Sequence, residues 1–118
     1  MRLSEIAEKI GAKVLTKKIN ADAILIDRIY AGDTVSDMLK AASDTILLVT
    51  NLSNTILPRV AELMDVPGIC LVKGVTPDPD ILSMAEEHGT VVLVSPVDMF
   101  ETCGRLYVCF DGKPNRSS

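Results

Sequence analysis

The chain has 118 residues, and at roughly 100–200 residues per domain this length corresponds to a single domain. Hydrophobic residues make up 47% and charged residues 24% of the chain, which excludes a disordered, collagen-like or disulfide-stapled protein. The 12 basic and 16 acidic side chains give a net charge of −4, which disfavours a nucleic-acid or anionic-membrane partner, because such partners need a basic patch.

The N-terminal part of the chain predicts one helix and two strands. Hydrophobic residues recur at helical spacing over residues 4–10, with Ser4 as the expected N-cap and Gly11 as the residue that ends the helix. A short strand is expected at residues 14–15. Residues 24–31 predict a second, longer strand.

Helices then alternate with continuous apolar strands. The expected helices cover residues 36–42, 56–64, 80–87 and 97–107, and the expected strands cover residues 45–50, 69–72 and 91–94. Strands this apolar are typical of a sheet buried on both faces, and strands joined by helices lie parallel. We therefore expect a three-layer α/β domain over residues 1–110, with a mainly parallel sheet between helices on both faces, and a flexible polar tail at residues 111–118.

The N-terminus and the cysteines predict a cytoplasmic protein. Glu5, Glu8 and Lys9 interrupt the apolar run that a signal peptide needs, and no stretch approaches the ~20 apolar residues of a membrane helix. The 3 cysteines are odd in number and lack paired spacing, which indicates reduced thiols.

Common catalytic motifs are missing from the sequence. It contains no Gly-x-x-x-x-Gly-Lys-Ser/Thr loop, no Gly-x-Gly-x-x-Gly and no Gly-x-Ser-x-Gly elbow. The single histidine, His88, precedes Gly89 and is expected to cap a helix C-terminus or balance its dipole. The only residues that could serve as the acid and base of an enzyme are Asp33, Asp37 and His88. Because none of the common motifs accompanies them, we expect no catalytic activity, no metal site and no cofactor.

The cysteines differ in their expected surroundings. Cys70 lies inside an expected buried strand, where an inert apolar thiol is the usual outcome. Cys103 and Cys109 lie in and just after the last expected helix, and a redox role for them stays open. An iron–sulfur cluster normally needs four thiolates, so this chain could only share one across a dimer.

Polar loops follow three of the expected strands, at the place where open α/β sheets bind ligands. They and the strand that precedes the first loop supply the candidates for contact with a small ligand or a facing subunit. These candidates are Asp27, Arg28, Tyr30, Gly32, Asp33, Ser36, Asp37, Asn51, Ser53, Asn54, Lys73 and Gly74.

Structural roles compete with these functional ones. Asp33 and Ser36 can cap the helix that follows them, and Asn51 and Asn54 can act only as turn formers.

Two of the candidates are charges within an apolar strand. Asp27 and Arg28 stand where charges are usually paired or at an edge, so they can form an ion pair with each other or across two subunits.

Several short segments, in this order and spacing, resemble the DRTGG domain family, whose fold is akin to the N-terminal domain of HPr kinase/phosphorylase. The resemblance covers about residues 1–110. The matching segments are Leu3–Lys9 with Val14-Leu15, Tyr30–Asp33 with Ser36–Met38, Ile69–Val72 with Gly74 and Pro77 followed by Asp78 or Asp80, and Phe100-Glu101 with Gly104–Tyr107. The motif that names the family is reduced to Asp27-Arg28, because Ile29–Ala31 stands where the family has Thr-Gly-Gly.

The resemblance implies a stand-alone regulatory or assembly domain without catalytic residues. Under this hypothesis the chain is a homodimer that binds a protein partner or a regulatory ligand. The alternative hypothesis is a small-molecule binding module for a nucleotide or another anionic metabolite, accessory to a redox or hydrogenase system, with Arg28 and Lys73 as countercharges. Neither hypothesis involves nucleic acid or a membrane.

Overall fold

The computed structural model describes residues 1–110, and the tail predicted at residues 111–118 lies outside the described residues. The strands are β1 (Lys13–Val14), β2 (Arg28–Ala31), β3 (Ile46–Thr50), β4 (Gly68–Leu71) and β5 (Val91–Val94). The helices are α1 (Leu3–Ile10), α2 (Val35–Ala41), α3 (Ile56–Met64), α4 (Pro79–His88) and α5 (Met99–Cys109), with a short 3-10 helix η1 (Ala21–Ala23).

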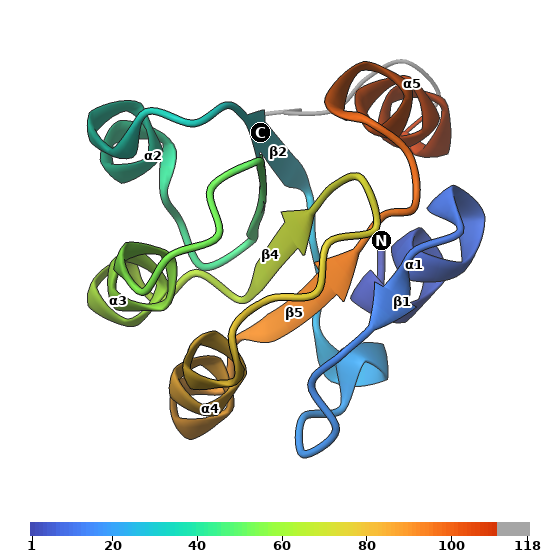
Figure 1. The fold of residues 1–118 in the computed structure, drawn as a ribbon. Coiled ribbons are helices and arrows are strands. Elements are labelled where there is room, and N and C mark those ends of the chain that lie inside the picture. The colour runs from blue at the N-terminus through green and yellow to red at the C-terminus, as the bar shows by residue number, and fades with distance from the viewer. Residues whose placement is uncertain (111–118) are drawn as a thin grey trace.

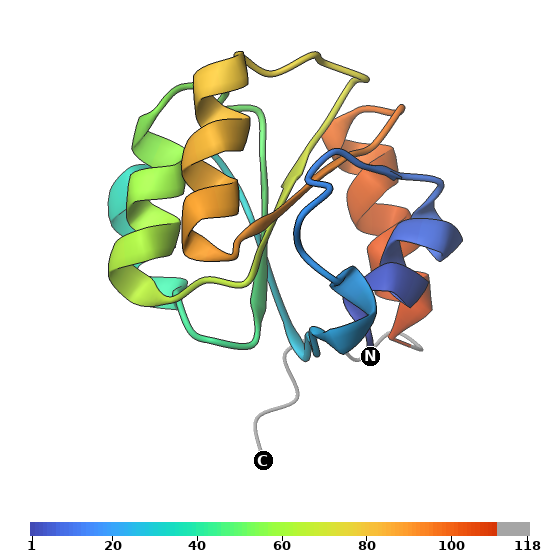
Figure 2. The same cartoon turned by 90° about the horizontal axis from the view of Figure 1, so that it is seen from below.

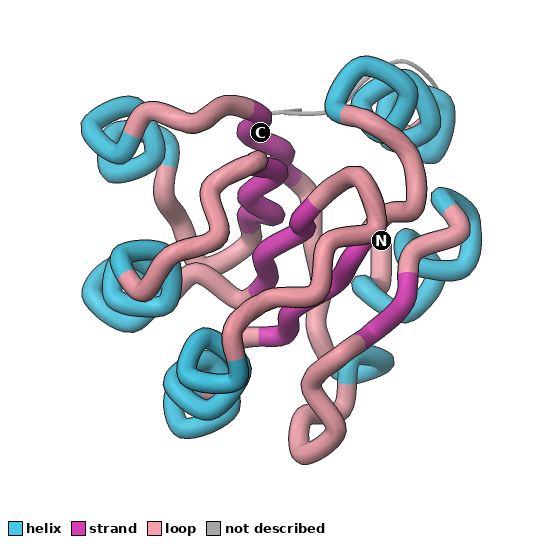
Figure 3. The backbone as a smooth tube through the Cα atoms, viewed as in Figure 1, coloured by secondary structure: helices cyan, strands magenta, loops and turns pink. Residues whose placement is uncertain are grey.

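One five-stranded sheet, in the order β1-β5-β4-β3-β2, forms the middle layer. Neighbours from β2 to β5 are parallel, and β1 joins the edge of β5 in antiparallel direction. Helices α2, α3 and α4 cover one face of the sheet, and α1 and α5 cover the other (Figures 1 and 2). In Figure 3 the strands run between these two groups of helices. The three-layer, mainly parallel α/β fold is confirmed.

The core is divided by the sheet into two clusters. Leu47 and Val49 pack with the residues of α1 and α5, whereas Ile46 and Leu48 pack with those of α3 and α4. Successive side chains of a strand point to opposite faces, so a continuous apolar run serves both clusters. All five residues of β3 are buried, which explains why its sequence shows no alternation.

Helix α1 begins one residue earlier than expected, and Ser4 is not its N-cap. Arg2 occupies that position. The backbone N–H of Leu3 donates to the carbonyl oxygen of Ile24 at 2.8 Å, and the hydroxyl of Ser4 donates to the Asp22 carboxylate at 2.8 Å. A contact with a distant segment therefore satisfies the helix end that a serine cap would otherwise serve.

The strand predicted over residues 24–31 is only half formed. Its first part is extended but pairs with the chain's own N-terminus, through an isolated bridge between Leu25 and Arg2 and a hydrogen bond from the N–H of Ile26 to Met1. The sheet strand β2 starts only at Arg28. Before this segment, the Asn20 side chain accepts from the N–H of Asp22 and starts η1.

The other predicted elements are present, with ends that shift by at most two residues. Strand β1 begins one residue earlier than expected, at Lys13. This shift places Lys13 opposite Val94, at the end of β5. Gly11 and Gly89 end α1 and α4 in the left-handed conformation, as expected for Gly11. No helix in residues 1–110 combines the length and the apolar character needed to cross a membrane.

Candidate ligand site at the carboxyl edge

Strands β2 to β5 are parallel, so their C-terminal ends share one side of the sheet, which we call the carboxyl edge. Four loops leave this edge, after Ala31, Thr50, Leu71 and Val94. Only the first three are expected from the sequence, because the fourth, residues 95–98, overlaps the expected last helix, whose first residue is Met99.

Asp33 joins two of these loops. Its Oδ1 accepts hydrogen bonds from the buried hydroxyl of Thr50 at 2.8 Å and from the backbone N–H of Asn51 at 2.7 Å. Its Oδ2 lies 3.4 Å from the donating Nδ2 of Asn51. The loop after β2 is thereby attached to the loop after β3.

The Asp33 carboxylate is held in its ionised form by these contacts. The hydrogen bond from the Asn51 backbone is the main reason that the pKa of Asp33 lies below its ordinary value, with further lowering by the Thr50 and Asn51 side chains and by the Lys73 charge. Partial burial of Asp33 opposes the shift without reversing it. Lys73 therefore acts electrostatically on this cluster from the loop after β4.

Tyr30 covers Gly32 on one face of the chain. A Cβ added at Gly32 would lie 2.5 Å from the Tyr30 hydroxyl oxygen and 3.0 Å from the adjacent ring carbon, so a larger residue here would push the end of the Tyr30 ring aside. Burial raises the pKa of Tyr30, and the nearby charges of Asp37 and Asp33 raise it further. Tyr30 thus stays a protonated hydrogen-bond donor beside two carboxylates. We call Tyr30, Asp33, Asp37, Thr50 and Asn51 the acidic cluster.

A tight turn follows β4. Lys73 and Gly74 both have φ 63°, in the left-handed region, which is uncommon for a residue with a side chain. Two hydrogen bonds of 2.8 Å hold the turn, from the N–H of Lys73 to the carbonyl of Val97 and from the N–H of Gly74 to the carbonyl of Ser95. The loops after β4 and β5 are therefore attached to each other as well.

A groove of about 380 Å³ opens beside this turn. Its walls come from the turn after α1, from β1, and from the loops after β4 and β5. We call it the edge groove, and it is lined by Gly11, Lys13, Leu15, Gly74, Val75, Thr76, Val94 and Pro96. Only Gly74 among these was a candidate from the sequence. Lys13 was missed because the position of β1 at the sheet edge depends on its antiparallel pairing with β5, which no sequence pattern showed.

Two buried hydroxyls fix the wall of the edge groove that carries Pro96. The Oγ of Ser95 and the Oγ1 of Thr102 lie 2.7 Å apart, and both residues are fully buried. The Thr102 hydroxyl also lies 3.3 Å from the carbonyl oxygen of Val97. The loop after β5 is therefore anchored to the first turns of α5, and the groove wall is preformed.

The remaining candidate residues of the loops either form turns or lie exposed. The Asn54 side chain accepts from the N–H of Ile56 at 3.0 Å, so Asn54 acts as a turn former at the start of α3. Ser36 lies exposed in the first turn of α2, and Ser53 is exposed in the loop before α3. Neither Asp33 nor Ser36 caps α2, whose N-cap position is held by Thr34.

Asp27 and Arg28 lie away from this site. Arg28 is the first residue of β2 and pairs with Ile46, the first residue of β3, so it stands at the opposite, amino edge of the sheet. Three further residues at about 3.3 Å each separate it from the carboxyl edge. Within residues 1–110, Asp27 and Arg28 form no ion pair with each other. Arg28 is therefore not a countercharge for the edge groove.

His88 also lies at the amino edge. It is the last residue of α4, as expected, and its Nε2 lies 3.1 Å from the Oε2 of Glu62 on α3. Helix α4 runs back across the sheet, so its end is far from the loops that carry Asp33 and Asp37. The structure therefore separates His88 from Asp33 and Asp37. Among the described residues, no group of three or more His, Cys, Asp or Glu side chains is placed to hold a metal ion.

The cysteines are protected to different degrees. Cys70 is fully buried in β4, and burial raises the pKa of its thiol to about 12, as expected for an inert thiol. Cys103 and Cys109 are half-buried on α5, and burial is the main cause that raises the pKa of each.

Comparisons with known proteins point to one family. A family model described as the DRTGG domain matches residues 5–109. Among solved structures, the chain is similar to the CBS and DRTGG domains of the regulatory region of Clostridium perfringens pyrophosphatase, crystallised with its activator, diadenosine tetraphosphate. The TM-score is 0.73 at 16% identity, and the match covers 95% of this chain and 47% of that one. The chain thus spans about half the length of this relative and shares its fold. No curated protein matches the chain.

Proposed function

We propose that this chain, which belongs to the DRTGG domain family, is a non-catalytic regulatory domain that acts as a homodimer and binds a small, anionic, nucleotide-like ligand in the edge groove. The observation that carries the proposal is the preformed groove beside the ends of the parallel strands. Ligands of open α/β sheets bind outside the carboxyl ends of the strands.

The chemistry of the edge groove suits a ligand with an apolar ring and an anionic group. Its volume of about 380 Å³ falls within the roughly 300–1,000 Å³ of small-molecule sites. Leu15, Val75 and Pro96 offer apolar surface for a base. The Lys13 ammonium and the Thr76 hydroxyl can donate to a phosphate, and exposed Lys73 stands next to Gly74 at the groove wall.

The structural relative supports the ligand class. Its regulatory region was crystallised with a dinucleoside polyphosphate activator. A ligand in the edge groove of this chain would touch the turn after α1 and the loop after β4 at once. Binding would therefore stabilise the relative positions of these segments.

A protein partner is the second candidate for binding, and it would bind at a different part of the carboxyl edge. The acidic cluster carries the exposed carboxylates of Asp33 and Asp37. A basic segment of another protein would find complementary charge there.

Isothermal titration calorimetry with ATP and with diadenosine tetraphosphate tests the proposed ligand site. We expect saturable binding of at least one probe by the wild-type chain, with the nucleotide recovered unchanged by chromatography. Lys13→Met should weaken binding about tenfold or more, because a hydrogen bond to a charged group contributes roughly 1.5–3 kcal/mol. Lys17→Met is the matched control, since Lys17 is exposed outside the groove. Equal affinities of the two variants, or no binding of either nucleotide, would contradict the proposal.

A further inference from the structure

The outer face of α5 carries large hydrophobic side chains in water. Phe100 is 88% exposed, Val108 is 74% exposed and Tyr107 is 56% exposed. Phe100, Gly104 and Val108 are spaced four residues apart, so they lie in a row along one side of the helix. Contiguous apolar surface of this kind marks an interaction site. We call Phe100, Gly104, Tyr107 and Val108 the α5 stripe.

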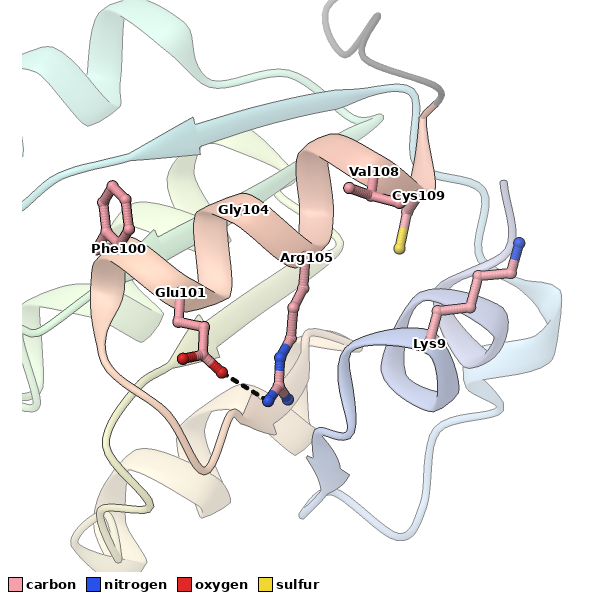
Figure 4. A pocket seen from close by; sticks show the side chains of 7 residues that line it. All are labelled: Lys9, Phe100, Glu101, Gly104, Arg105, Val108 and Cys109. Atoms are coloured by element: carbon pink, nitrogen blue, oxygen red, sulfur yellow. Dashed lines mark hydrogen bonds and ion pairs between the residues drawn. The ribbon is translucent and has the colours of Figure 1, made fainter.

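A groove of about 610 Å³ lies along the stripe, between α5 and α1 (Figure 4). Arg105 stiffens it. Its guanidinium donates to the carbonyl oxygen of Ile10 at 2.8 Å and to the Oε2 of Glu101 at 2.8 Å. The first bond attaches α5 to the end of α1, so the groove between the helices has a fixed shape.

Gly104 is unexplained by contacts within the described chain. It lies inside α5, where glycine is unfavourable, and a Cβ added to it would meet nothing within 4 Å. Gly32 differs, because the end of the Tyr30 ring occupies the space next to it. A small residue on the outer face of a helix allows a second helix to approach closely.

We propose that a second copy of this chain covers the α5 stripe, with the two α5 helices antiparallel about a two-fold axis at Gly104. This inference rests on the proposed homodimer and names its surface. Phe100 and Val108 stand four residues on either side of Gly104, so the axis places each Phe100 against Val108 of the second copy. A two-fold interface needs a self-complementary surface of this kind.

The charges at the two ends of α5 fit the same arrangement. Asp98 is exposed at the N-cap of α5, whereas Lys9 lines the groove beside Cys109, at the other end of the helix. An antiparallel pair brings the acidic end of each α5 toward the Lys9 end of the other. The helix dipoles are also opposed in this orientation.

The exposed area is of the size that a dimer contact needs at its centre. Two copies of Phe100 and Tyr107, at the exposed fractions given above, contribute roughly 600 Å² if an aromatic side chain presents about 200 Å². Specific interfaces bury about 1,200–2,000 Å² in total. The four aromatic rings, two from each copy, therefore supply up to about half of a small interface, and the flanking groove and charges surround them.

Multi-angle light scattering after size-exclusion chromatography tests the surface. The wild-type chain should elute with twice the 12.7 kDa monomer mass. Phe100→Lys should give the monomer mass at the same concentration. The matched control is Leu63→Lys, since Leu63 is 73% exposed on α3 and lies off the stripe.

A second variant separates loss of the interface from loss of the fold. Gly104→Gln adds a better helix former with a side chain in open space, so it should keep or raise helical circular dichroism and still give a monomer. Dimers in both α5 variants would overturn the proposed surface and leave the homodimer in place. A monomeric wild type across the micromolar range would overturn both. Monomers in both α5 variants beside a dimeric Leu63→Lys would establish the stripe as the interface.

Discussion

Asp33 accepts a 2.7 Å hydrogen bond from the backbone N–H of Asn51, and this bond connects the ends of β2 and β3. The hydroxyl of Thr50 reaches the same carboxylate oxygen. The attachment of the loop after β2 to the loop after β3 therefore depends on one ionised side chain, and several consequences of this arrangement are measurable.

Asp33→Asn should lower the free energy of unfolding by about 1 kcal/mol, because an amide oxygen accepts these hydrogen bonds more weakly than a carboxylate at a solvent-exposed site. Urea denaturation measures the difference. Asp44→Asn is the control, since Asp44 lies in an exposed turn before β3, and it should change stability by less than about half this amount. Equal effects of the two substitutions would contradict the role of Asp33.

The contribution of Asp33 should depend on pH. Its pKa in the folded chain lies below the ordinary value of 3.8, so the stabilisation is fully present above that value and is lost as pH falls through the lowered pKa. Unfolding of the wild type and of Asp33→Asn, followed from about pH 6 to pH 2, should therefore converge at the acidic end. A stability difference that stays constant over this range would mean that ionisation of Asp33 is irrelevant.

Gly32→Ala should destabilise the chain by about 1 kcal/mol, the lower end of the cost of overpacking, because the new methyl group displaces the partly exposed end of the Tyr30 ring. The cause is tested by a double-mutant cycle with Tyr30→Val, which removes the ring. The two substitutions should couple by at least about 0.5 kcal/mol, with Gly32→Ala less harmful in the Tyr30→Val background. Strict additivity would show that the loss arises elsewhere.

The thiols should react at very different rates. At pH 8 a disulfide reagent such as DTNB should leave Cys70 unmodified in the folded chain, because Cys70 is fully buried and its thiol pKa is about 12. Cys103 and Cys109 should react more slowly than free cysteine, since burial raises the pKa of each. In denaturing urea all three should react alike. Rapid labelling of Cys103 or Cys109 in the folded state would favour a redox role.

Much of the fold was predictable because strong local patterns coincide with the tertiary structure. The apolar runs that became β3, β4 and β5 are buried on both faces, and Gly11 ends α1 in the conformation expected of it. The expectations that were wrong concern segments whose structure depends on contacts with a distant part of the chain. Ser4 lost its expected cap role because Ile24 bonds to the start of α1, and residues 24–26 pair with the N-terminus and not with the sheet.

The site was predictable only in part, for the same reason. Asp33, Asn51 and Lys73 follow parallel strands, so the sequence brought them to one edge correctly. Lys13 reaches that edge because β1 pairs with β5 in antiparallel direction, which places Lys13 opposite Val94, 81 positions further along the chain. No local sequence pattern encodes this pairing. Arg28 lies three residues before the end of β2, at the amino edge of the sheet, so it is too far from the loops of the carboxyl edge to act as a countercharge there.

Native mass spectrometry of protein purified gently from its own cell tests most directly whether the chain is a homodimer that binds a nucleotide-like ligand. The method reports stoichiometry and retained small molecules together. We predict a dimer of twice 12.7 kDa with added mass that matches a nucleotide. A monomer without added mass, unchanged after addition of ATP or diadenosine tetraphosphate, would contradict both parts of the claim.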